Sequence, residues 1–186
     1  MAEVSLNYPW YSRPEGREIT QGDILFDCPV LKPIEVDQTS EASEGSQIEG
    51  HLHSFTVVIM SQACDIAQKD ITEIILCPLE VWDENAAKKQ ERWEKLQKNR
   101  IISRLLLNKD DGFPYHVVDF RMVFSLPKTF VEDFAERAHR RLRLLPPYRE
   151  HLAQAFARFF MRVGLPIDIP EFGERDSNAS RGMGSG

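Results

Sequence analysis

The 186-residue sequence has no long apolar run and very little cysteine. No apolar stretch approaches the ~20 residues that a membrane-spanning helix needs, so we expect no membrane association. The first residues lack a basic segment followed by an apolar core, so no signal peptide is expected. These absences predict a cytoplasmic protein.

The three cysteines, Cys28, Cys64 and Cys77, are an odd number and form no C-x-x-C pair. A disulfide framework needs paired cysteines, and a structural zinc site needs closely spaced ligands. The sequence therefore predicts neither of them, and it indicates no cofactor.

The net charge of -6 is unevenly distributed along the chain. Residues 1–50 carry ten acids and three bases, whereas residues 134–163 carry seven arginines and two glutamates. An acidic balance argues against indiscriminate coating of nucleic acid, but a local arginine cluster still permits one anionic contact.

The hydrophobic pattern predicts one domain at residues 19–166, preceded by an arm at 1–18 and followed by a disordered tail at 167–186. Five short strands are expected, at 19–26, 51–61, 72–79, 101–107 and 115–125. Residues 35–50, between the first two expected strands, are acidic and serine-rich, which is typical of a mobile loop.

Three helices are expected beside these strands. Residues 83–100 read as an exposed inserted helix, residues 128–139 lead into a helical C-terminal part that includes 140–145, and residues 147–163 carry a complete apolar stripe. The expected fold is therefore mainly β with α: a small SH3-like β-barrel with an inserted helix and a C-terminal helical lid.

Short segments in a fixed order resemble the MazF/PemK-type toxin family. They are Gly-Asp-Ile at 22–24, Val-Val-Ile-Met-Ser at 57–61, Ile-Leu-Cys-Pro at 75–78, and a penultimate-strand pattern at 118–127. The similarity covers roughly residues 19–163. It implies an SH3-like barrel, a toxin–antitoxin setting and endoribonuclease activity.

A second resemblance is to a group of small bacterial proteins that share Q-G-D-I, S-Q-x-C-D and R-x-G-L-P. These patterns occur here at 21–24, 61–65 and 162–166. This resemblance implies no activity.

The toxin family places an arginine-proline pair just before its V-V-x-x-S strand, where the arginine stabilises charge on the phosphate. This sequence has His-Ser-Phe-Thr at 53–56 instead. The missing pair favours a non-catalytic binding or regulatory module, in which the barrel and its 35–50 loop engage another protein. The alternative is a toxin-like endoribonuclease or another enzyme.

The end of the 51–61 strand carries the candidate catalytic residues Ser61, Cys64 and Asp65. Cys64 could serve as a nucleophile or a redox thiol, with Asp65 orienting a nearby histidine. His51, His53 and His116 are the candidate bases, and His53 is counted among the candidate catalytic residues. In the structural interpretation, Ser61 and Asp65 satisfy backbone N–H groups at the turn, and Cys64 is a small buried hydrophobe. The sequence leaves both interpretations open.

A metal site is the less favoured interpretation of the same region. His51 and His53 would point to one face of a strand, and Cys64 with Asp65 would complete four ligands. Because this spacing matches no standard site, no metal is expected.

The candidate binding residues are Arg121, His151, Arg158 and Arg162. The last three lie along one line of the 147–163 helix and could bind phosphate, which makes RNA a candidate partner beside a protein partner or a second copy of the chain. Alternatively, these arginines pair with acids or cap helix ends. Asp119 and Arg121, on one strand face, are expected to form an internal ion pair or to line a pocket.

Overall fold

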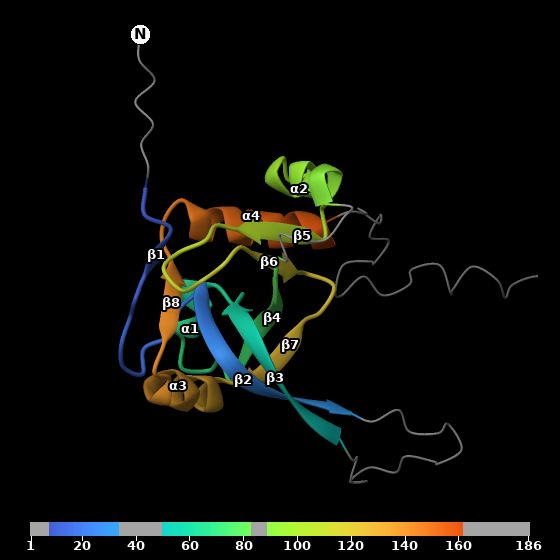
Figure 1. Ribbon diagram of the computed structural model, residues 1–186. Coiled ribbons are helices and arrows are strands. Elements are labelled where there is room, and N and C mark those ends of the chain that lie inside the picture. Colours follow the sequence, from blue (N-terminus) through green and yellow to red (C-terminus); the bar gives the residue numbers. More distant parts are fainter. Residues whose placement is uncertain (1–7, 34–49, 83–88, 162–186) are drawn as a thin grey trace, which may run out of the picture.

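The computed structural model describes residues 8–33, 50–82 and 89–161 (Figure 1). The strands are β1 (Tyr11–Ser12), β2 (Asp23–Pro33), β3 (Gly50–Ile59), β4 (Glu73–Val81), β5 (Arg104–Leu107), β6 (His116–Asp119), β7 (Phe124–Pro127) and β8 (Arg141–Leu144). The helices are α1 (Ala63–Ile66), α2 (Lys89–Gln97), α3 (Lys128–Arg137) and α4 (Tyr148–Phe160). The expected class, mainly β with α, is confirmed.

The strands form one eight-stranded sheet in which every pairing is antiparallel. Its order is β1-β8-β2-β3-β4-β6-β5, and β7 pairs with the first half of β4. Within the described residues no pairing joins β1 to β5, so the sheet is open at these two edges. Strand β4 links the two parts of the sheet because its second half pairs with β6.

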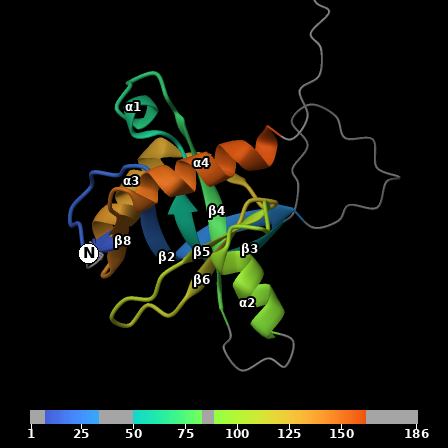
Figure 2. The same ribbon diagram turned by 90° about the horizontal axis from the view of Figure 1, so that it is seen from above.

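Both faces of β3 are buried only toward its end, at residues 57–59, whereas residues 51–54 are exposed, so the prediction of two buried faces for the 51–61 strand holds only for its second half. Neighbouring residues enter different cores: Val58 packs with Leu152 of α4, whereas Val57 packs with Val131 of α3. Helix α4 therefore covers one face of the sheet and α3 the other, with the strands between them (Figures 1 and 2).

The start of β2 is held against the end of β3 by buried polar contacts. The turn requires Gly22, whose φ is 84° and whose N–H donates to the Ile59 carbonyl at 2.9 Å. The side chain of Gln21 donates to the Met60 carbonyl at 3.0 Å, and Asp23 accepts from Arg143 at 2.9 Å. The Q-G-D-I segment thus has a structural role at the junction of three strands.

The expected strand at 115–125 is wrong, because the chain turns in its middle. Strand β6 ends at Asp119, and β7 begins at Phe124 and pairs with a different part of β4. The Asp119 carboxylate accepts from the backbone N–H of Arg121 at 3.0 Å, a local contact that favours a turn over continued strand pairing.

The helical interpretation of 140–145 is also wrong. Strand β8 pairs with β1 and β2, and its Leu142 and Leu144 are buried while Arg143 is turned to Asp23. This alternation has the period of a strand. The following helix does begin directly after Pro147, as expected.

Helix α2 spans Lys89–Gln97 and so ends before residue 100, where the expected helix ends; residues 83–88 of that expected helix lie outside the described residues. The Glu91–Lys95 ion pair of α2 is present at 2.6 Å. Most of the 35–50 loop, the 167–186 tail and Arg162 lie outside the described residues. Among the helices of the described part, none combines the length and apolar character needed to cross a bilayer.

Candidate functional site

The first candidate, Ser61, has a structural contact at the end of β3. Its Oγ accepts a hydrogen bond from the backbone N–H of Ile75 at 2.9 Å. This contact ties the turn after β3 to β4, as the structural interpretation of Ser61 predicts.

The thiol of Cys64 lies on the one-turn helix α1 and is exposed. The structural prediction of a small buried hydrophobe is therefore wrong for this residue. Its Sγ lies 3.6 Å from a carboxylate oxygen of Asp65 and 3.7 Å from the side-chain oxygen of Gln62.

The proposed base, His53, is exposed on β3 and pairs in register with Val30. It lies six residues before the strand end at Ile59, which corresponds to about 20 Å of extended chain. The structure therefore does not bring His53 to Cys64. Within the described ranges, no group of three or more His, Cys, Asp or Glu side chains could hold a metal.

The buried carboxylate of Asp119 is the centre of an ion-pair network. It accepts from Arg104 at 3.0 Å and from Nε of Arg121 at 2.8 Å, and Arg104 also lies 3.2 Å from Glu80. The hydrogen bond from Arg121 is the main reason that the pKa of Asp119 is lowered. The ion pair between Asp119 and Arg121 is present, but the Arg121 side chain is 58% exposed, so the pair is not internal. Arg121 is engaged in the turn after β6 and is not placed beside α4.

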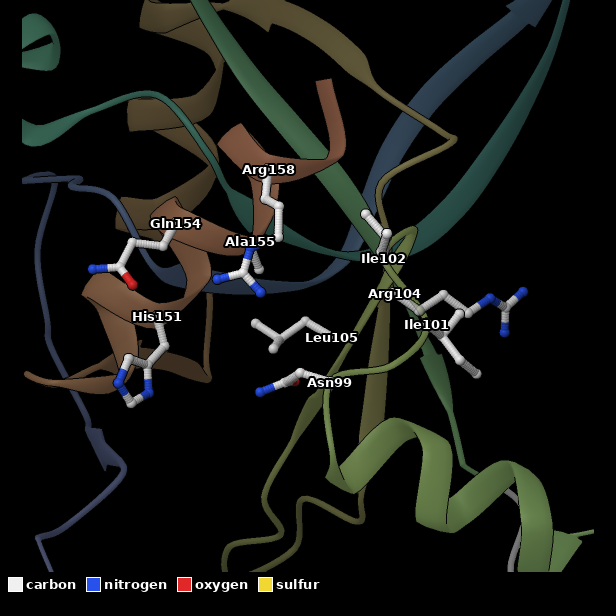
Figure 3. Close-up of a pocket in the computed structure, with 9 residues that line it drawn as sticks. All are labelled: Asn99, Ile101, Ile102, Arg104, Leu105, His151, Gln154, Ala155 and Arg158. Carbon is white, nitrogen blue, oxygen red and sulfur yellow. The ribbon is translucent and has the colours of Figure 1, made fainter. Parts of the chain in front are cut away.

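Two other candidate binding residues, His151 and Arg158, lie on α4 in the wall of one cavity of about 240 Å³ (Figure 3). The opposite wall comes from the segment between α2 and β5. The lining residues are Asn99, Ile101, Ile102, Arg104, Leu105, His151, Gln154, Ala155 and Arg158.

The side chain of Arg158 reaches into the gap between α4 and β5, toward Leu105, whereas Arg104 points away from the gap (Figure 3). Arg158 is exposed and forms no ion pair with any residue in the described part of the chain. The cation of Arg104 is already matched by Asp119 and Glu80. Arg158 is therefore the guanidinium of this cavity that has donors left for a ligand.

A second cavity, of about 270 Å³, continues the first and shares Asn99, Leu105 and His151 with it. Its far end is lined by Trp10 and Tyr148, whose rings stack with centroids 3.6 Å apart. We call the two cavities together the α4 groove. It has a cationic end at Arg158 and an aromatic end at Trp10.

The sequence predicted only the helical wall of this groove. His151 and Arg158 are seven residues apart on one helix, so periodicity places them on the same side. Asn99 and Leu105 carry no local signal, and Trp10 reaches Tyr148 only because β1 pairs with β8. An interaction between residues this far apart in the chain cannot be found from spacing.

No protein-family model matches the sequence, and no curated protein is significantly similar to it. The chemistry of the α4 groove therefore rests on its own residues. Its described lining contains no Ser, Cys, Asp or Glu, and it combines two arginines, a histidine and amide side chains with an apolar floor. Such a lining can bind an anionic group.

Proposed function

We propose that this protein is a non-catalytic binding module and that its α4 groove binds an acidic segment of a partner protein. The observation that carries the proposal is Arg158, a guanidinium that pairs with no carboxylate among the described residues and lies in a groove whose described lining has none. A carboxylate of the partner would accept two hydrogen bonds from its planar fork.

The groove suits a peptide better than a nucleic-acid strand. Strand binding needs several phosphate contacts, but Arg104 is neutralised by Asp119, so Arg158 with His151 would contact one or two anionic groups. An apolar floor of Ile102 and Leu105 beside the cation fits an aliphatic side chain next to a carboxylate.

The finer fold and setting belong to the same proposal: an SH3-like barrel related to MazF/PemK proteins, acting in the cytoplasm as a monomer or homodimer. The order of the matching segments supports the relation. Many barrels of this shape only bind, and a fold does not determine an activity.

The toxin-like endoribonuclease alternative has less support. It would use the segment from Ser61 to Asp65, but the Ser61 hydroxyl is engaged with the Ile75 amide and His53 lies at the other end of β3. RNA remains the second candidate partner, and it is an outcome of the experiment below.

The experiment measures fluorescence anisotropy of a labelled peptide that alternates leucine and glutamate. Wild-type protein should bind it, and a peptide with glutamine in place of glutamate should bind more weakly. Hydrogen bonds to charged groups contribute about 1.5–3 kcal/mol, so Arg158→Gln should weaken binding at least about tenfold. Arg137→Gln makes the same change at an exposed position of α3, outside the groove, and should leave the affinity unchanged.

Two outcomes would contradict the proposal. Equal binding of the two peptides, or equal binding by Arg158→Gln, would show that the anionic contact is not made in the groove. Tighter binding of labelled oligouridine than of the peptide, with cleavage lost in Cys64→Ala, would instead support the endoribonuclease alternative.

A further inference from the structure

A separate cavity of about 500 Å³ lies between the arm at 13–16, the end of α3 and the start of β8. The arm crosses beside α3 and β8 at one side of the molecule (Figure 1). The lining residues are Arg13, Pro14, Glu15, Gly16, Ala135, Glu136, Ala138, His139, Arg140 and Arg141. We call it the arm cavity, and it shares no lining residue with the α4 groove.

The arginine at the start of β8, Arg141, is the unusual residue of this cavity. It is only 4% exposed, and its Nη2 donates to the carbonyl of Glu15 at 3.2 Å. Its Nε and Nη1 are buried and have no hydrogen-bond partner among the described residues. Two acids, Asp23 and Glu18, act on it electrostatically, and Asp23 is already bound by Arg143.

Other arginines with low exposure in the described part of the chain are matched by carboxylates. Arg104 contacts Asp119, and Arg143 contacts Asp23. Burial lowers the pKa of Arg141, whereas the hydrogen bond to Asp23 raises the pKa of Arg143. A buried charge is unfavourable unless it is paired. An anion that accepted hydrogen bonds from the free donors of Arg141 would therefore stabilise its buried guanidinium.

Further cations surround the cavity. Arg13 lies 2.6 Å from Asp110, and Arg140 lies over the ring of Phe26 at 4.5 Å from its centroid. His139 is exposed at the same cavity.

Two acids also line the arm cavity. The carboxylate of Glu136 is 3.9 Å from Arg17, which partly neutralises it, and Glu15 is exposed. The three lining arginines outnumber the two lining acids, and one of these arginines, Arg13, is itself paired with Asp110. The balance of charge favours an anion.

We propose that the arm cavity binds a phosphate group, either free phosphate or the phosphomonoester of a small molecule. The Nε–H and Nη1 hydrogens of Arg141 point to different sides of the guanidinium, so a tetrahedral phosphate would accept from one of these two donors and from a second guanidinium at once. The cavity has the volume of a small-molecule site, which usually lies in the range of about 300–1,000 Å³.

The test is isothermal titration of the full chain with inorganic phosphate, phenyl phosphate and acetate, at constant ionic strength. One saturable site is expected for phosphate or phenyl phosphate, with much weaker binding of acetate. Tighter binding of phenyl phosphate than of phosphate would identify a phosphomonoester as the ligand, and the reverse order would identify the free ion.

Arg141→Lys should reduce this affinity at least tenfold, because lysine cannot reproduce the planar set of donors. Arg13→Gln, at the exposed edge of the cavity, should reduce it severalfold and is expected to fold even if Arg141→Lys does not. Arg100→Gln removes the same charge from an exposed position outside the cavity and should bind as the wild type does.

The proposal is overturned if the wild type shows no saturable binding of either phosphate compound, or if acetate binds equally well. It is also overturned if both Arg141→Lys and Arg13→Gln bind phosphate with wild-type affinity.

Discussion

Replacing Asp119 with asparagine should destabilise the protein strongly while leaving its shape almost unchanged. Asp119 is 1% exposed and accepts hydrogen bonds from Arg104 and Arg121. The asparagine is nearly the same size, so the substitution removes the charge and little of the packing. Arg104, with a side chain 13% exposed, then loses its buried partner.

The expected cost follows from the burial of the partners. Breaking a buried ion pair by removing one partner costs about 3–5 kcal/mol. Glu80 remains 3.2 Å from Arg104, so we expect the lower part of that range, about 3 kcal/mol. For a chain of this size, that loss corresponds to a fall in Tm of about 6–12 °C.

A matched control separates the two arginines. The Arg121 side chain is 58% exposed, so Arg121→Gln should cost only about 0–1 kcal/mol, as exposed ion pairs do. This holds although the hydrogen bond from Arg121 is the largest cause of the lowered pKa of Asp119.

The pH dependence gives a further check on the same residue. Because folding lowers the pKa of Asp119, its stabilising effect is complete above the ordinary aspartate pKa. It is lost as the pH falls through the lower, folded-state pKa, so wild type and Asp119→Asn should converge in stability in acid. The assay is urea unfolding followed by tryptophan fluorescence at several pH values.

A difference between wild type and Asp119→Asn of less than about 1 kcal/mol at pH 7 would refute this reasoning, since that is the size of an exposed pair. An equal loss in Arg121→Gln would refute it as well.

The remaining predictions concern the thiols and the packing of α4. At pH 8 a disulfide reagent should label only Cys64 in the folded protein, because Cys28 and Cys77 are buried. Burial also raises the pKa of Cys28 to about 11 and the pKa of Cys77 to about 12. Rapid labelling of all three thiols would contradict the described core. Leu152→Ala should lower the free energy of unfolding in urea by about 2–5 kcal/mol, because Leu152 is fully buried. Phe160→Ala, at a 59% exposed position, should lower it much less. Similar losses in the two variants would show that α4 does not pack as described.

Part of the candidate site could be predicted because its signal is local. His151 and Arg158 share a helical face by spacing alone, and Ser61 follows a buried strand where a hydroxyl commonly satisfies a backbone group. Local spacing also misled, since the alternation at 115–125 continues through a turn that the Asp119 side chain creates.

Two features depended on chain segments far apart. Strand β8 lies between β1 and β2 and pairs with both of them. This pairing buries Arg141 beside Glu15 of the arm. The strand-end cysteine lacked its expected base because His53 lies at the other end of β3.

The sequence by itself determined the mainly β class, the buried second half of β3 and the apolar stripe of α4, because the period of burial is written into neighbouring residues. Only the tertiary structure decided which charges are paired. Arg104 and Arg143 meet carboxylates, whereas Arg158 and Arg141 meet none within the part of the chain that the structure describes. The physical reason is that the energy of a charge depends on its burial and its nearest partner, and both are set by contacts between distant segments.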